Sequence, residues 1–105
     1  MNCYEKDYKM DRDYILDLLA QYKKNNHDKY GIENIGIFGS VARDEVTETS
    51  DVDVCIEIKT PDMFMLVHIQ EELQNLFHKS VDIVRLRKTM NPYLKKRIEK
   101  EAIYV

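Results

Sequence analysis

Residues 35–40 read Ile-Gly-Ile-Phe-Gly-Ser, and residues 51–58 read Asp-Val-Asp-Val-Cys-Ile-Glu-Ile. The first stretch contains the end of a short apolar run, 32–38. The β-branched and aromatic residues of this run predict a strand. The second stretch alternates polar and apolar residues, which predicts a strand with one face buried. Gly39-Ser40 follows the first strand directly, and we expect Ser40 to cap a short helix over residues 41–45.

The remainder of the chain predicts three helices and a third strand. Apolar residues at three- and four-residue spacing predict a helix over 11–30, followed by a helix-ending glycine, Gly31. A second helix is expected over 61–77, with its proline in the first turn. Its expected buried stripe comprises Met65, Leu66, Ile69, Leu73, Leu76 and Phe77. A strand over 81–86 and a last helix that begins at Pro92 complete a small sheet with helices packed against it.

The composition limits the possible classes of protein. The 105 residues, 44% of them apolar and 33% charged, are expected to form one globular domain. No run of eighteen apolar residues is present, which excludes a membrane span, and residues 1–10 lack the apolar core of a secretory signal. Cys3 and Cys55 are isolated, so neither a disulfide framework nor a zinc site is indicated. We therefore expect a cytoplasmic protein.

Basic residues are concentrated near the end of the chain, although the net charge is −3. This basic stretch has one acid, Glu99, among seven basic residues: Arg85, Arg87, Lys88, Lys95, Lys96, Arg97 and Lys100. It is interpreted either as a solvated helix face or as a surface for a partner or polyanion. Extended nucleic acid is disfavoured as a ligand, because a dedicated binder usually has a positive balance and interleaved aromatic residues.

Three aspartates form the strongest chemical signal. Asp51 and Asp53 occupy alternate strand positions and therefore point to one face. Asp82 lies near the start of another predicted strand, in an apolar run where an acid is unusual unless it has a cation. Either feature alone is compatible with an ordinary strand surface. Together they predict carboxylates that converge on one face as ligands of Mg²⁺, which prefers oxygen donors.

The Gly39-Ser40 turn is a second candidate feature. Glycine lets the backbone approach a ligand closely, and the first N–H groups of a following helix attract anions. A phosphate fits such a place, although a plain turn needs no ligand. Arg43, one turn later, is expected either to neutralise phosphate charge or to pair with Asp44 or Glu48 at the surface.

The Gly39-Ser40 turn, followed after residues 41–50 by Asp51-Val52-Asp53, resembles the signature of the polymerase-β-type nucleotidyltransferase superfamily. The Val-Ala-Arg after the serine resembles its smallest branch, the prokaryotic minimal nucleotidyltransferases. Residues 78–84 and 98–103 also fall where that branch has counterparts. Relatives often carry glycine at the position of Asp44. The resemblance implies a single minimal nucleotidyltransferase domain over residues 1–105.

The same resemblance implies a palm-like, small mixed β-sheet with packed helices, of the α/β (α+β) class. It implies that Asp51 and Asp53 bind two Mg²⁺ ions, and that Asp82 binds the ion that activates the acceptor hydroxyl. The Gly39-Ser40 turn would hold the β- and γ-phosphates of ATP, and Arg43 is a further candidate for nucleotide binding. Two metal ions can stabilise the attacking and leaving oxygens of such a transfer.

The resemblance also bears on the acceptor of the transferred nucleotide. Members of the branch are commonly encoded beside a HEPN-domain ribonuclease toxin, and the resemblance implies an antitoxin that transfers AMP to a toxin tyrosine. Complex formation with that partner is therefore expected. Two alternatives stay open: a non-catalytic antitoxin that acts by binding alone, and a small-molecule nucleotidyltransferase. The carboxylate set of Asp51, Asp53 and Asp82 favours an enzyme, because binding alone does not need converging acids.

Overall fold

The structure is a computed structural model that describes residues 11–47 and 49–105. The predictions that concern Cys3 and the amino-terminal residues 1–10 lie outside the described residues, and so does the predicted pairing of Arg43 with Glu48.

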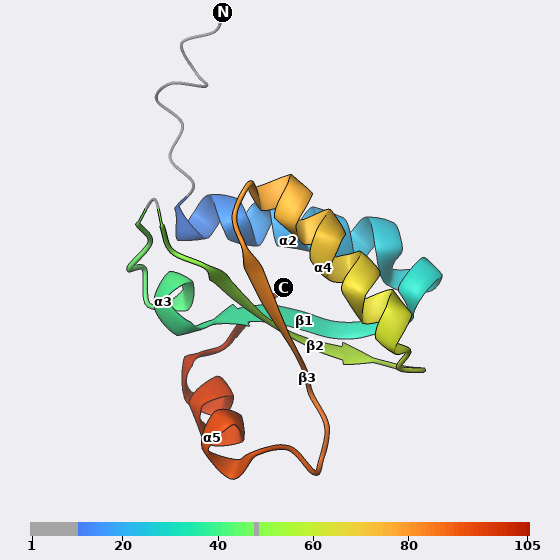
Figure 1. The fold of residues 1–105 in the computed structure, drawn as a ribbon. Coiled ribbons are helices and arrows are strands. Elements are labelled where there is room, and N and C mark those ends of the chain that lie inside the picture. The colour runs from blue at the N-terminus through green and yellow to red at the C-terminus, as the bar shows by residue number, and fades with distance from the viewer. Residues whose placement is uncertain (1–10, 48) are drawn as a thin grey trace, which may run out of the picture.

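A mixed sheet is the centre of the fold (Figure 1). Within the described residues it has four strands in the order β3-β2-β1-β4. Strand β1 pairs antiparallel with both β2 and β4, whereas β2 and β3 are parallel. The strands are β1 (Ile32–Phe38), β2 (Val52–Ile58), β3 (Val81–Arg85) and β4 (Ile103–Tyr104). The predicted mixed sheet is confirmed, and β4 is an addition that the sequence patterns did not predict.

Two long helices cover one face of this sheet, α2 (Arg12–Tyr30) and α4 (Met63–Phe77) (Figure 1). The Asp11 side chain caps α2 by accepting a hydrogen bond from the Tyr14 N–H, 2.9 Å. Gly31 ends α2 in the left-handed conformation (φ 66°), as predicted. Helix α4 begins later than predicted, because the side chain of Asp62 caps it and leaves Pro61 outside the first turn.

The main hydrophobic core fills the space between these helices and the sheet. Its fully buried members on the helices include Ile15 and Leu19 of α2 and Ile69 and Leu73 of α4. Of the predicted stripe on α4, Ile69, Leu73 and Phe77 are buried, and Met65, Leu66 and Leu76 are partly buried. The apolar residues that recur with the 3.6-residue period of each helix thus lie on the face that packs against the sheet.

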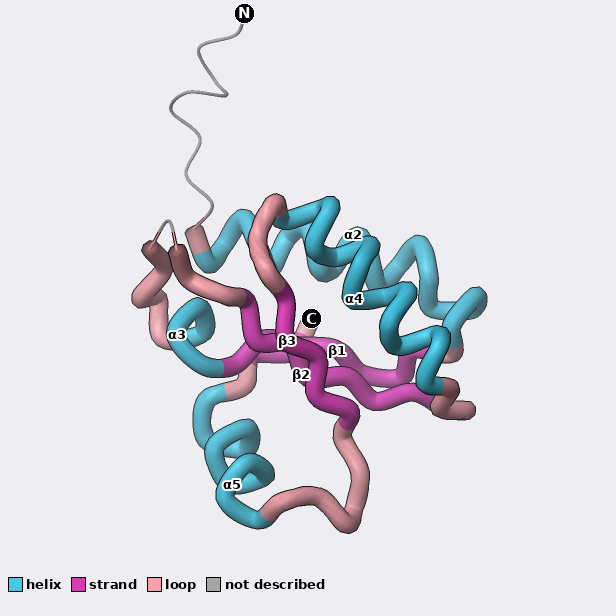
Figure 2. The backbone as a smooth tube through the Cα atoms, viewed as in Figure 1, coloured by secondary structure: helices cyan, strands magenta, loops and turns pink. Residues whose placement is uncertain are grey.

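The other face of the sheet is partly covered by α5 (Pro92–Glu101). The loop after β3 crosses to this side and leads into the helix (Figure 2). Asn91 caps α5 through its side chain. A second core cluster forms beneath the helix from Phe38, Cys55 and Ile98. Cys55 is therefore completely buried, although the alternation of residues 51–58 placed it on the polar side of the strand.

The short helix after β1 also differs from its predicted position. Helix α3 covers Gly39–Ala42, whereas the prediction placed it over residues 41–45. Its N-cap position is Phe38, which makes no side-chain cap hydrogen bond, so the prediction that Ser40 caps this helix is wrong. The left-handed conformation of Gly39 (φ 76°) turns the chain into the helix directly after the strand.

No helix in residues 11–47 and 49–105 combines the length and the apolar character needed to cross a membrane.

Candidate active site

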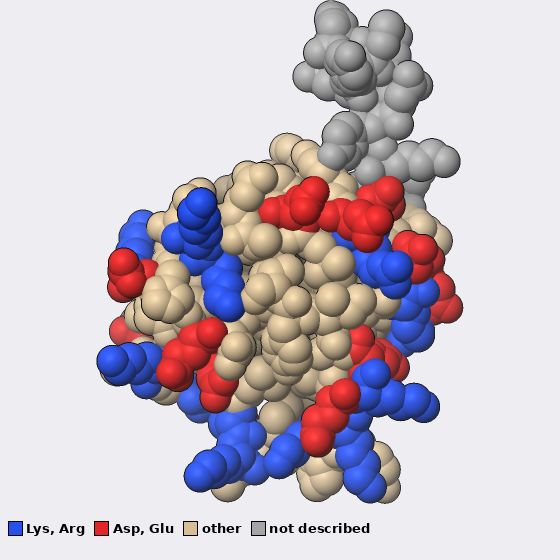
Figure 3. All heavy atoms as spheres, turned by 180° about the vertical axis from the view of Figure 1, so that it is seen from behind, with Lys and Arg blue, Asp and Glu red and all other residues tan. Residues whose placement is uncertain are grey.

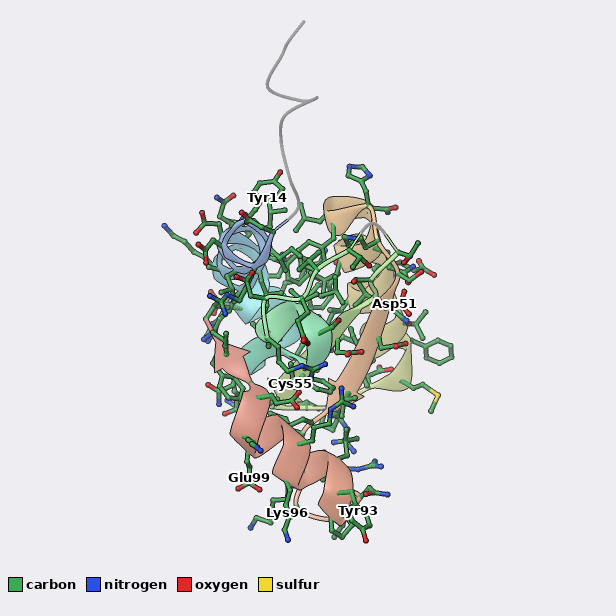
Figure 4. The ribbon with its side chains drawn as sticks, turned by 90° about the vertical axis from the view of Figure 1, so that its left-hand side faces the viewer. Tyr14, Asp51, Cys55, Tyr93, Lys96 and Glu99 are labelled. Carbon is green, nitrogen blue, oxygen red and sulfur yellow. The ribbon has the colours of Figure 1, made fainter. Side chains whose placement is uncertain are left out.

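The backbone of two parallel strands places the predicted acids at one end of the sheet. Asp53 on β2 is the register partner of Asp82 on β3, and Asp51 directly precedes β2. Side chains two residues apart on a strand point to one face, so Asp51 and Asp53 share the face on which Cys55 meets α5. Asp53 is partly buried, and the other two aspartates are exposed. Figure 4 shows Cys55 between the sheet and α5.

The electrostatics of Asp53 reflect this crowding. Burial raises the pKa of Asp53, and the nearby charges of Asp82 and Asp51 raise it further. The positive charges of Arg97 and Arg43 act in the opposite direction but do not cancel the upward shift of the pKa. A carboxylate in this environment is under like-charge repulsion, which a bound cation would relieve.

The candidate metal ligands of this site are the carboxylates of Asp51, Asp53 and Asp82. In the described part of the chain, no three His, Cys, Asp or Glu side chains are grouped so that they could hold a metal ion. Metal binding by Asp51, Asp53 and Asp82 therefore stays a prediction, and the backbone places Asp53 and Asp82 side by side. The oxygen-only donor set still fits Mg²⁺, because this ion is usually bound through one or two carboxylates together with water and phosphate.

Gly39 brings the turn after β1 into contact with the acids. A Cβ atom built on Gly39 would collide with Oδ2 of Asp53. The carboxylate therefore lies in space that only a glycine at this position leaves open, and the positive φ of Gly39 makes the same demand independently. Ser40, the next residue, is partly buried, and its carbonyl oxygen accepts a hydrogen bond from the Glu45 N–H (2.8 Å).

Arg43 has acidic partners other than those predicted. Its Nε donates to Oε1 of Glu45 (2.7 Å), and its Nη1 donates to Oε1 of Glu101 on α5 (3.0 Å). The predicted partner Asp44 makes neither of these contacts. Asp44 instead has the left-handed φ of 63°, a backbone conformation that glycine adopts without a Cβ penalty. The Arg43 side chain points toward α5, on the side of the sheet where the acids lie.

Arg97 and Glu101 are site residues that the sequence analysis missed. The guanidinium of Arg97 lies 5.6 Å from the ring centroid of Phe38, the residue before Gly39. Its Nε is 3.5 Å from Oε1 of Glu101, which also accepts a hydrogen bond from the Gly39 backbone N–H (3.1 Å). The only local signal was an opposite-charge pair four residues apart inside the basic stretch. That signal is common on solvated helices.

The other basic side chains of α5 are consistent with a solvated surface. Lys and Arg gather at the end of the molecule where α5 lies (Figure 3). Lys95, Lys96 and Lys100 are exposed on this helix. Arg97 is thus the member of the basic stretch on α5 that belongs to the site.

The arrangement joins a carboxylate pair on parallel strands to a glycine turn with two arginines at its rim. The nucleotidyltransferase domain family matches residues 19–105. The chain belongs to this family. The predicted class of enzyme, a nucleotidyltransferase, is thereby confirmed, and so is the predicted nucleotidyltransferase fold.

Two relatives illustrate the position of the chain within the nucleotidyltransferases. A protein of Methanocaldococcus jannaschii, named provisionally as a protein adenylyltransferase, is 42% identical over 92 residues, which are 87% of this chain and 94% of the relative. The protein adenylyltransferase MntA of Thermococcus cleftensis is 30% identical over 92 residues, which are 87% of this chain and 92% of the relative. Both relatives are matched along most of their own length.

Solved structures share the fold of this nucleotidyltransferase. A chain assigned provisionally as a minimal nucleotidyltransferase has a TM-score of 0.73 and 27% identity, covering 91% of this chain and 97% of that chain. The structure of a tri-AMPylated Shewanella oneidensis HEPN toxin with an MNT antitoxin gives a TM-score of 0.66 and 17% identity, covering 89% of this chain and 70% of that chain. The second likeness shows a common fold only.

Proposed function

We propose that this nucleotidyltransferase transfers AMP from Mg²⁺-bound ATP to a tyrosine hydroxyl of a HEPN-domain toxin and thereby acts as an antitoxin. The observation that carries the proposal is the juxtaposition of Asp53 and Asp82 with the Gly39 turn. The names of the relatives from Methanocaldococcus and Thermococcus support AMP as the transferred group and a protein as the acceptor.

In this proposal, Asp51, Asp53 and Asp82 hold Mg²⁺. The side chains of Asp51 and Asp82 are exposed, so they could reorient to bring their carboxylate oxygens to the ion. Bound Mg²⁺ supplies stabilisation of negative charge on the attacking and leaving oxygens. The chain itself positions the triphosphate, through the backbone at Gly39 and Ser40 and the guanidinium of Arg43. The acceptor oxygen would attack the α-phosphorus, the bond between the α- and β-phosphates would break, pyrophosphate would leave, and the hydroxyl proton would pass to water. No covalent intermediate on the protein is required.

The proposed acceptor of the AMP group is a residue of the partner protein. The HEPN toxin in the Shewanella complex is described as AMPylated, which supports a toxin as the acceptor in the present case. A tyrosine provides the hydroxyl that such a transfer needs. Both proteins would meet in the cytoplasm, where ATP is available, and the enzyme would form a complex with its partner during transfer.

The test is a transfer reaction with labelled ATP, Mg²⁺ and the HEPN-domain protein encoded beside the gene. We expect the partner to gain the mass of one or more AMP groups, located by peptide mass spectrometry on tyrosine. A partner variant with phenylalanine at the modified position is the control and should gain no label there. Neutralisation of the toxin without any added mass would support antitoxin action by binding alone. Label on an added aminoglycoside or other small hydroxyl compound, with none on protein, would support a small-molecule enzyme.

A further inference from the structure

Three positively charged or positively polarised groups contact one carboxylate oxygen of Glu101. Its Oε1 accepts hydrogen bonds from the Gly39 backbone N–H (3.1 Å) and from Nη1 of Arg43 (3.0 Å). Nε of Arg97 is 3.5 Å from the same oxygen. The Glu101 side chain is only 18% exposed, so water competes little for these contacts. The Arg43–Arg97–Glu101 cluster is therefore an anion-binding arrangement that an anion of the chain itself fills.

Arg97 is held at this place by contacts other than its ion pair. Its guanidinium lies over the ring of Phe38, 5.6 Å from the centroid. A Cβ atom built on Gly39 would be 3.3 Å from Nη2 of Arg97 and would collide with the carboxylate of Asp53. Arg97 thus lies beside both the turn proposed to bind phosphate and an acid proposed to bind metal. Its side chain is 47% exposed, so a ligand can reach it.

Carboxylate and phosphate oxygens accept the same charge-assisted hydrogen bonds from arginine and backbone N–H groups. We infer that Arg97 is a phosphate-binding residue of this site, and that Glu101 occupies a phosphate position until the triphosphate of ATP displaces it. The inference rests on the proposed function, because it takes the Gly39 turn as the triphosphate site. On displacement, Arg43 and Arg97 exchange a carboxylate partner for phosphate, and Glu101 turns toward solvent.

A purely structural role for Glu101 predicts the opposite effect of its removal. If Glu101 only positions the two arginines, its loss disorders them and weakens ATP binding. If Glu101 competes with phosphate, its loss removes the competitor and strengthens ATP binding. The sign of the change in ATP affinity therefore separates the two roles.

The experiment measures ATP binding to the whole chain by calorimetry, once with Mg²⁺ and once in chelator. We expect Glu101→Gln to bind ATP about threefold or more tightly, because the amide keeps an acceptor for the Gly39 N–H but carries no charge. We expect Arg97→Gln to bind ATP about tenfold more weakly in both conditions, and Arg97→Lys to recover part of the loss. Adenosine, which has no phosphate, should bind all variants alike.

Glu99→Gln and Lys96→Gln are the matched controls. They make the same charge changes on the same helix, and both residues are exposed and point outward from α5 (Figure 4). Thermal unfolding of each variant checks the fold, and Arg97→Lys carries the test if Arg97→Gln does not fold. Weaker ATP binding by Glu101→Gln would overturn the inference, and so would variants of Glu101 and Arg97 that bind ATP like their controls. In either case the proposed function would still stand if the parent chain transfers AMP. A parent chain that binds no ATP would overturn both.

Discussion

The carboxylate of Asp53 fills the space beside Gly39 in which any other residue at that position would carry its Cβ atom. Gly39→Ala should therefore lower the free energy of unfolding in two ways, by strain at the positive φ and by displacement of the carboxylate. We expect a total loss of about 2 kcal/mol. Denaturant unfolding of the variant and the parent measures this loss.

Gly31→Ala is the matched control, because Gly31 has a similar φ (66°) but a Cβ there meets Lys59 only at an ordinary 3.4 Å. It should cost about 1 kcal/mol, the backbone part alone. In an Asp53→Ala background the cost of Gly39→Ala should fall toward that of Gly31→Ala, because the collision is removed. An equal cost of Gly39→Ala in both backgrounds would show that Asp53 does not contact the turn.

Asp53→Asn should abolish transfer without harm to the fold. Burial and then the charge of Asp82 raise the pKa of Asp53, so the ionised carboxylate is disfavoured in the folded protein. The neutral amide of asparagine removes this unfavourable charge. In chelator at neutral pH we expect the free energy of unfolding to rise by about 0.5 kcal/mol, as for a screened charge pair. AMP transfer should fall by several orders of magnitude, because a proposed metal ligand is lost.

The stability gain of Asp53→Asn has a defined pH dependence. It should be fully present above the raised pKa of folded Asp53 and should vanish below the ordinary aspartate pKa, where the parent residue is also uncharged. Urea unfolding in chelator at neutral and acidic pH measures both limits. A variant that is less stable than the parent in chelator, or that transfers AMP at the parent rate, contradicts this prediction.

Asp44→Gly should stabilise the protein without loss of activity. Asp44 has a left-handed φ of 63°, which glycine adopts without a Cβ penalty. We expect a gain of about 0.5 kcal/mol in the free energy of unfolding, with Arg43 still paired to Glu101 and AMP transfer unchanged. Asp44→Ala retains a Cβ and should give no gain. His78→Gly, at the C-cap of α4 with φ 54°, should give a similar gain at a second place.

Glu72 links the two long helices through a pair of tyrosine hydroxyls. Its Oε1 accepts hydrogen bonds from Tyr22 of α2 (2.7 Å) and from Tyr30 at the end of that helix (2.9 Å). Burial alone would raise the pKa of Glu72, but these hydrogen bonds, together with the charges of Lys29 and His68, lower the pKa overall. Glu72→Gln should therefore cost about 1.5 kcal/mol at neutral pH, the scale of hydrogen bonds to a charged group.

The cost of Glu72→Gln should depend on pH with a known sign. Because the folded-state pKa is lowered, the stabilisation is fully present above the ordinary value of 4.5 and is lost as the pH falls through the lowered pKa. Denaturant unfolding at neutral and strongly acidic pH should show the parent and variant approaching each other in stability. The exposed neighbour Glu71→Gln is the control and should show little change at either pH. An equal gap between parent and Glu72→Gln at both pH values would rule out the ionised acceptor.

The elements that depend on local signals agree with their predictions. Helix α2 starts after Asp11 and ends at Gly31, since a capping carboxylate and a left-handed glycine act on adjacent backbone groups. Strand β1 covers the predicted residues 32–38.

The start of α4 was misplaced because Asp62 and Pro61 are both good helix-start residues, and local sequence does not rank them. The two-residue β4 has no period to detect, and it forms only because β1 offers an open edge.

Part of the site was also readable from the sequence. The alternation of β2 placed Asp51 and Asp53 on one face, and the apolar run around Asp82 marked a second strand. Their proximity, however, depends on the parallel register that pairs Asp53 with Asp82. Register is set by the packing of whole strands and helices, so the pattern of either strand alone did not contain it.

Helix α5 accounts for the residues that no local pattern could assign. It packs against the acid-bearing face of the sheet, which buries Cys55 and brings Arg97 and Glu101 against Gly39. Arg97 and Gly39 are far apart along the chain, and the charges of α5 read as an ordinary solvated helix. Their contact arises because Ile98 must bury its side chain against the sheet, and a helix that buries one residue carries its neighbours to the same place.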